Sequence, residues 1–326
     1  MANRIFVFAV IVLWLSSMSW LVVERILPSF YTGEPPIEQA YETGEAVAWK
    51  VEWGGKPVGQ AASVRLSGVA GTTDLYNRVV LTDIPLMDLA PAWMRNTIGD
   101  LGNITFDAHT RIEFDPLGNF SSFNSRISIN DLPSMLNITG RVEDSFLQLR
   151  VRSGDISYTS PIYLPDSKSL NEVLFPDAKL PQMYVGRSWR EEIYSPFHSP
   201  GSPVELVQAK VVSVEAIQYL GETYKTLRIE YRAMSRSGIP QEARLQAESW
   251  VDLSGNVLRR DVYLGNSKLR FTRLADEAAK EAGVQLLKEL IRTGAEIELT
   301  PRGQPNSTRK GSRGASSSKK NRHFAA

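Results

Sequence analysis

Most of the chain alternates between apolar and polar residues in short runs, which is the pattern of half-buried β-strands. The alternation is clearest over residues 225–233, where apolar residues occupy every second position and charged residues lie between them. A sheet built from such strands has one apolar face and one polar face that is exposed to solvent. The predicted strands cover residues 46–53, 58–67, 74–82, 103–114, 120–130, 136–142, 146–152, 155–163, 187–195, 204–218, 223–235, 241–252, 256–263 and 267–273.

The connections between these strands are short and rich in turn residues. Gly54-Gly55, residues 115–119, Gly221 and residues 254–256 all contain glycine, with proline or asparagine in several of them. Such spacers favour hairpins between antiparallel neighbours. A parallel sheet would need crossover connections of helical length, and no helical pattern separates these strands. The sequence therefore predicts an antiparallel sheet.

Two segments have helical rather than strand-like spacing. Residues 84–98 are amphipathic but interrupted by Pro91, whereas residues 274–292 form a long amphipathic pattern that places Leu286, Leu290 and Ile291 on one face. An apolar sheet face needs a cover. We therefore predict a mainly β fold in which a large curved antiparallel sheet, a half-barrel or open barrel, is covered by helix 274–292.

The N-terminal segment predicts the compartment. Residues 5–23 carry no charge and match the thickness of a bilayer in length. Arg4 precedes them and five glutamates against one arginine follow within residues 24–46, so the positive-inside rule places the bulk of the chain outside the membrane. We predict a single-pass protein of the inner membrane whose body is periplasmic. Ser17-Met18-Ser19 also has the spacing of a signal-peptidase site, so a cleaved signal peptide is the alternative.

The predicted organisation is an anchor at residues 1–25, a linker at 26–44, a β domain at 45–300 and a disordered basic tail at 301–326. Hydrophobic residues make up 42% and charged residues 22% of the chain, as in ordinary globular proteins. The tail holds seven Lys and Arg residues and no acid, whereas residues 1–300 hold 30 basic and 36 acidic residues. We expect the tail to attract an anionic polymer. Outside the membrane we expect no nucleic-acid partner.

The residue types exclude several kinds of chemistry. The chain has no cysteine, and its three histidines are His109, His198 and His323. No G-x-S-x-G turn or phosphate-binding glycine loop is present. His109 shares one strand face with Arg111 and Glu113, which is equally the pattern of a wet sheet face, and His198 lies in a proline-broken loop. We predict no catalytic residue, no metal ligand and no cofactor.

Large apolar residues are the remaining candidates for a site. Trp93, Met94, Phe106 and Phe114 could line a ligand cavity in the concavity of the sheet, and packing in the core explains them as well. An apolar cavity would suit a lipid or a similar ligand.

Two stretches resemble exported bacterial β-domains. Residues 49–59 contain W-K-V-E-W-G-G-K-P-V-G, which resembles an opening gGkkvG hairpin, and residues 250–273 resemble a closing W-x-d-x-x-G-x-v-l-r hairpin. This pair resembles the uncharacterised β-region that precedes transglutaminase-like domains. The long antiparallel meander resembles, more loosely, the lipoprotein carriers of the LolA/LolB type. The resemblance implies an exported β fold, and it transfers no catalytic residue because the chain lacks cysteine.

These observations favour a membrane-anchored module of the bacterial envelope that binds or assembles without catalysis, with an envelope protein or lipid as its partner. The alternative is a carrier or sensor of an apolar ligand held in the concavity of the sheet.

The composition of the tail makes a stability prediction. Residues 301–326 have almost no apolar area to offset the entropy of ordering. Truncation after Thr300 should therefore change the melting temperature by less than about 2 °C, measured by circular dichroism on the membrane-extracted protein. A loss of several degrees would show that the tail docks on the domain.

Overall fold

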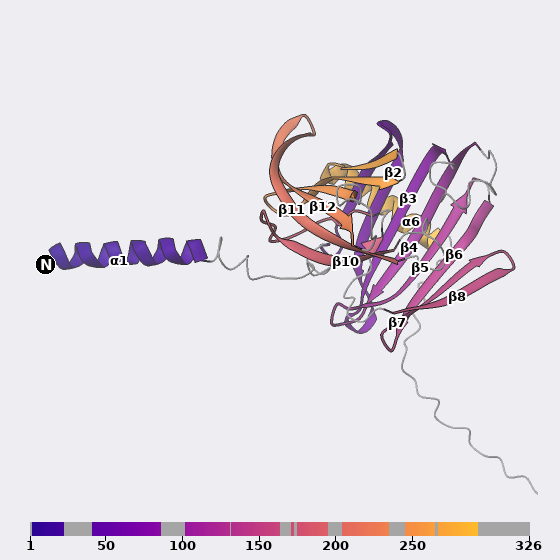
Figure 1. The fold of residues 1–326 in the computed structure, drawn as a ribbon, viewed down its shortest axis with the longest axis horizontal. Helices are drawn as coiled ribbons and strands as arrows, with labels where there is room; N and C mark the ends of the chain where they lie inside the picture. The colour runs from indigo at the N-terminus through magenta and orange to yellow at the C-terminus, as the bar shows by residue number, and fades with distance from the viewer. Residues whose placement is uncertain are drawn as a thin grey trace, which may run out of the picture.

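The computed structural model describes residues 2–22, 41–85, 102–130, 132–163, 171–172, 175–194, 204–234, 245–264 and 267–292. A long curved sheet dominates these residues (Figure 1). The elements are α1 (Ala2–Leu21), β1 (Ala46–Trp53), β2 (Lys56–Ser67), η2 (Val69–Gly71), β3 (Thr73–Pro85), β4 (Asn103–Phe114), β5 (Phe120–Ile129), β6 (Leu132–Glu143), β7 (Phe146–Ser153), β8 (Ile156–Tyr163), β9 (Asn171–Glu172), β10 (Ser188–Tyr194), β11 (Val204–Tyr219), β12 (Glu222–Ala233), β13 (Leu245–Asp252), β14 (Val257–Leu264), β15 (Ser267–Arg273) and α6 (Asp276–Arg292).

The described strands form one 15-stranded open sheet in the order β8-β7-β6-β5-β4-β3-β2-β1-β15-β14-β13-β12-β11-β10-β9. Every neighbouring pair is antiparallel except β9 and β10, which are parallel. The prediction of a mainly β protein with a large open antiparallel sheet is therefore confirmed. Strand β9 is the one described strand that the sequence pattern did not predict.

The sheet consists of two meanders joined at a single seam. Strands β1 to β8 and strands β10 to β15 each follow chain order, and β1 pairs with β15 between them. In this seam Trp49 lies opposite Arg273 and Trp53 lies opposite Leu269. The first and last strands of the domain thus hold its two halves together.

Two tight turns with the same sequence pattern set the register on both sides of the seam. Asp115 and Asp252 each begin a D-x-x-G-N turn, and each carboxylate accepts backbone N–H groups from residues two and four positions later at 2.8–2.9 Å. The glycines Gly118 and Gly255 have φ values of 79° and 90°, which a residue with a side chain rarely adopts. These local hydrogen bonds explain why the loops predicted at these positions form hairpin turns.

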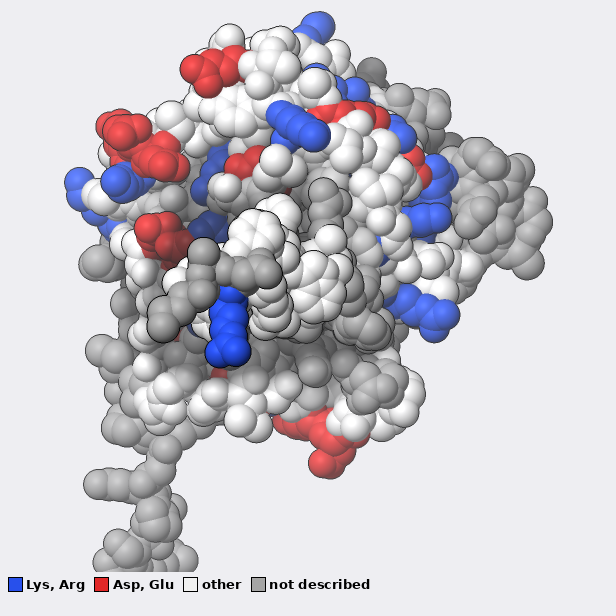
Figure 2. Space-filling view, turned by 90° about the vertical axis from the view of Figure 1, so that its left-hand side faces the viewer, with Lys and Arg blue, Asp and Glu red and all other residues white. Residues whose placement is uncertain are grey.

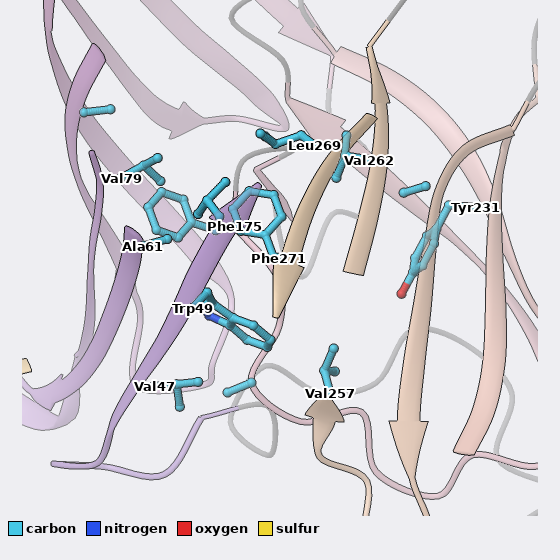
Figure 3. Packing of buried hydrophobic residues seen from close by; sticks show 14 of the residues in the cluster. Val47, Trp49, Ala61, Val79, Phe175, Tyr231, Val257, Val262, Leu269 and Phe271 are labelled. Carbon is cyan, nitrogen blue, oxygen red and sulfur yellow. The ribbon is translucent and has the colours of Figure 1, made fainter. Parts of the chain in front are cut away.

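The main hydrophobic core lies on the inner face of the curved sheet. Trp49 and Phe271 from the seam strands, Val79 from the first meander and Tyr231 from the second all belong to one buried cluster (Figure 3). The two meanders therefore bury their apolar faces together, with no helix between them in the described part of the chain.

One irregular segment, residues 175–187, completes this core. Phe175, Ala178 and Leu180 are buried in the main cluster, and Phe175 lies beside Phe271 in Figure 3. The segment is fixed by backbone hydrogen bonds, from Leu180 N to Gly255 O at 2.7 Å and from Val257 N to Ala178 O at 3.1 Å. It thus packs as part of the inner face although it is not a strand.

Helix α6 covers the opposite, outer face of the sheet at β1 and β2. Ala48 and Val64 pack with Ala279 and Leu286 of the helix in a second, smaller cluster. Because successive strand residues point to opposite faces, Ala48 faces the helix while Trp49 faces the main core. The predicted covering helix is present, but it covers a small-residue patch on the outer face. The curvature of the sheet covers the main apolar face.

A close approach defines this helix contact. A Cβ atom on Gly283 would lie 2.3 Å from Ala46 Cβ, so only glycine lets the helix reach the sheet at this point. Leu286 is buried one turn further on, and Leu287 packs beside it. Helix residues 290–292 lie outside the residues whose side chains are described, which includes the predicted core positions Leu290 and Ile291.

Helix α6 offers a matched pair of substitutions. Leu286→Ala should lower the free energy of unfolding by about 2–5 kcal/mol because it removes buried apolar volume. Val284→Ala, at a position that is 51% exposed on the same helix, should lower it by less than about 0.5 kcal/mol. Chemical denaturation of the two variants measures both values, and equal small losses would mean that the helix does not pack on the sheet.

Candidate functional site

A cluster of polar side chains lies within the apolar interior of the second meander. Arg260 is 2% exposed, and its guanidinium lies 4.7 Å from the ring centroid of Tyr231. Its Nη1 atom lies 3.8 Å from Oδ2 of Asp177, which belongs to the irregular segment 175–187. Tyr41 approaches from the N-terminal side and donates a hydrogen bond from its hydroxyl to Pro176 O at 3.0 Å. We call Tyr41, Asp177, Tyr231 and Arg260 the inner polar cluster.

Burial governs the protonation of this cluster. Loss of solvation raises the pKa of Asp177, and the positive charge of Arg260 opposes this increase without cancelling it. Burial likewise raises the pKa values of Tyr41 and Tyr231, so both phenols stay neutral at any physiological pH. The cluster therefore holds a carboxyl group whose pKa lies above its ordinary value, next to a buried arginine side chain.

The arrangement fixes the chain in place. Arg260 and Tyr41 bind successive residues of the segment 175–187, and Arg273 donates a hydrogen bond to Ala178 O at 2.8 Å. Nearby on the same inner face, Glu191 accepts a hydrogen bond from Trp189 Nε1 at 3.0 Å. Within the described ranges no group of three or more His, Asp or Glu side chains could hold a metal ion. The contacts of the cluster hold the irregular segment 175–187 against the inner face of the sheet.

A surface groove of about 660 Å³ lies between α6 and the turns of the second meander. Tyr219 and Tyr224 from the β11–β12 hairpin form one wall, with ring centroids 5.3 Å apart and edge to face. Asp276, Lys280 and Val284 from α6 form the opposite wall. Both apolar rings and charges of either sign line the groove, which suits a polar chain with apolar side groups better than a purely apolar ligand.

Several of the charged groups that line the groove are already engaged in interactions within the fold. Lys179 forms an ion pair with Glu42, and Arg273 binds Ala178 O. Asp252 caps its own turn through Ser254 N and Asn256 N. Of the other charged residues that line the groove, Asp276, Glu277 and Lys280 belong to α6 and Glu45 precedes β1. Recognition in the groove would therefore depend on α6 and the tyrosine pair.

The structure separates the residues that the sequence singled out. Phe106 and Phe114 are 4% and 1% exposed and belong to the main core, whereas Trp93 and Met94 lie outside the described residues. Their role as the lining of a ligand cavity stays a prediction. His109, Arg111 and Glu113 share the outer face of β4, where Asp107, Asp74 and Ser122 respectively are their partners. His198 lies outside the described residues.

Sequence reasoning missed the inner polar cluster. The signal was present in β14, where Arg259-Arg260-Asp261 stands between apolar residues in the middle of a strand. Such a run requires at least one charge to face inward, because successive side chains alternate between faces. Nothing in the sequence indicated that Asp177, some 80 residues earlier, would meet this charge.

Comparisons with known proteins give weak likenesses. No family model matches the chain, and no curated protein matches it. A solved β-barrel-like protein of the domain of unknown function DUF1849 from Brucella abortus superposes with a TM-score of 0.43 at 9% identity, covering 75% of this chain and 98% of its own. A Bacteroides fragilis protein with a YmcC-like fold, described as exported, gives 0.28 at 10% identity, covering 74% and 97%. Likenesses this small do not extend to activity or partners.

The inner polar cluster makes a pH prediction. A carboxyl whose pKa is higher in the folded protein binds its proton more tightly there, so its contribution to stability falls as pH rises above about 4 through the raised value. The unfolding free energy of the wild type, minus that of Asp177→Asn, should therefore decrease between about pH 4 and pH 8. Denaturant titrations of both proteins across this range give the difference. An increase with pH would mean that the pKa of Asp177 is lowered by the fold.

Proposed function

We propose that this protein is a membrane-anchored module of the bacterial envelope that binds a partner without catalysis, with its β domain outside the inner membrane. The observation that carries the proposal is the exposure of α1. Its window Arg4–Leu21 is apolar enough to cross a membrane and has no buried residue. Large side chains such as Phe6, Leu13 and Trp20 are 66–69% exposed.

A helix with this surface is not stable as a free element in water. Apolar residues surround it on all sides, so it has no polar face to turn toward solvent. A bilayer satisfies both its apolar side chains and its internally bonded backbone. A signal peptide has a similar composition, which is why retention of the segment in the mature protein is the decisive property.

The groove beside α6 is the surface that we propose for the partner, an envelope protein or a lipid. It combines aromatic rings with charges on a rigid helix, and it lies on the outer face of the sheet where a partner has access. Binding to a groove of this kind requires no nucleophile, metal or cofactor.

The anchor is tested with the full chain and a charged variant. The wild type should remain in the membrane pellet after alkaline extraction, and its intact mass should include residues 1–23. Leu13→Arg should release the protein because a charge at the centre of a span costs about 2.5–3.5 kcal/mol, whereas Leu13→Ile should not. A reporter fused after Ala326 should be active only in its extracytoplasmic form.

Two results would contradict the proposal. An intact mass that corresponds to a mature protein starting near residue 20 would mean that the segment is a cleaved signal peptide. Activity of a cytoplasmic reporter alone would mean that the orientation is reversed.

A further inference from the structure

On the outer face of the sheet, charged side chains are paired differently on the central strands and at the β5–β8 end. On the central strands, arginines are paired with carboxylates, as in Arg78–Asp107 at 2.9 Å, Arg228–Glu248 at 3.1 Å and Arg270–Asp261 at 2.8 Å. Figure 2, which views the molecule from the left-hand side of Figure 1, also shows acidic and basic residues side by side. Because the two kinds of charge are mixed, these surfaces have no large region of purely positive or purely negative charge.

Four arginines on β5, β6 and β7 have no such partner. Strand register places Arg126 and Arg152 opposite the same residue, Asn137, and places Arg150 opposite Thr139. Arg141 lies two residues along β6 from Thr139, on the same face, and is therefore diagonal to Arg150. Within the described residues, none of the four belongs to an ion pair or to a hydrogen bond of its side chain. We call these residues the arginine face.

The arginine face is accessible and otherwise neutral. Arg141, Arg150 and Arg152 are exposed, and Arg126 is half-buried. The residues between them are Asn, Thr, Gln and Ser, all of which donate or accept hydrogen bonds without charge: Ser122, Asn124, Asn137, Thr139, Gln148, Ser157 and Thr159. The described acids near this face are Glu113 of β4, which accepts a hydrogen bond from Ser122, Glu143 at the end of β6, and Asp144 and Asp155 in the adjoining turns. The strands themselves thus present a positive surface.

Exposed apolar residues border the same face. Phe146 and Tyr163 pair across β7 and β8, are 41% and 62% exposed, and have ring centroids 5.4 Å apart. Successive residues of a strand point to opposite faces, and Phe146 lies an even number of residues, four, before Arg150 in β7. Phe146 and its partner Tyr163 therefore lie on the same face as the arginines. Met135, near the start of β6, is 42% exposed. It lies two residues before Asn137, so its side chain points to the same face of the sheet. Arginines bordered by exposed aromatic rings suit the interface of a bilayer, where the rings lie among head groups and the cations bind anions.

We propose that the arginine face docks on the anionic lipid head groups of the membrane in which α1 is inserted. The inference rests on the proposed anchor and names a partner for the anchored domain. Charge complementarity selects an anionic surface, and the aromatic border selects a lipid interface over a soluble polymer. Residues 23–40 can span at most roughly 60 Å, so the tether keeps the domain within reach of that bilayer.

The absence of cysteine makes a clean test possible. Thr159→Cys, on the exposed outer face of β8 opposite Arg150, gives a unique attachment point for an environment-sensitive fluorophore. Glu222→Cys, at the first residue of β12, labels a distant exposed position. The full chain is reconstituted into vesicles of phosphatidylcholine alone or with phosphatidylglycerol as about a third of the lipid.

Docking should shift the emission of the Thr159 label to shorter wavelength in the anionic vesicles alone, and the Glu222 label should not respond. About 1 M salt should reverse the shift, because the Debye length falls to about 3 Å. Arg150→Gln/Arg152→Gln should lower the docking equilibrium constant by about 30-fold, at the usual contribution of each basic residue near such a surface. Lys56→Gln/Lys225→Gln removes the same charge from exposed sites elsewhere and should have no effect.

Equal emission in the two kinds of vesicle would overturn the proposal, as would equal losses in the arginine and lysine variants. A shift produced by soluble dextran sulfate but not by anionic vesicles would identify a polymer as the partner and would overturn it also. Alkaline extraction of the same samples keeps the two proposals apart, because every variant retains α1. A retained chain with an unshifted label contradicts the arginine face alone, and a released chain contradicts the anchor.

Discussion

The rest of the structure depends on the need to bury one apolar face of a very long sheet. On the inner face, neither meander has a separate core in the described residues, because the cluster that buries Trp49 and Val79 also contains Tyr231 and Val257. The pairing of β1 with β15 makes the two halves one curved surface, and curvature then brings the inner faces together. The irregular segment 175–187 fills the space between them, and buried charges fix it in place.

This solution leaves the outer face free for other roles. A small-residue patch on β1 and β2 receives α6, where Gly283 permits the close approach. On both sides of the helix the strands carry pairs of opposite charges. These pairs keep the outer face polar and solvent-exposed without strong repulsion between like charges. The β5–β8 end departs from this pattern, since its four arginines form no ion pair with a described carboxylate.

Local features of the fold were predictable from the sequence, and the long-range ones were not. Alternation and turn residues predicted strands such as β4 and β15 at their observed bounds, because both signals act over a few residues. The seam was not predictable, since Trp49 and Arg273 are separated by most of the domain and nothing local selects their register. Asp177 and Arg260 were missed for the same reason. The arginines were visible singly, but only the order of β5, β6 and β7 reveals that they share one surface.

The central claim is that the two meanders share one core and therefore form one cooperative unit. Native-state hydrogen exchange tests it by comparing the opening free energies of slow amides in β3 and β4 with those in β12 and β13. A shared core requires that the slowest amides of both halves exchange only through the same global unfolding, with equal free energies and equal dependence on denaturant. If the slow amides of one half exchange at a distinctly lower free energy while the other half stays protected, the halves fold separately and the account is wrong.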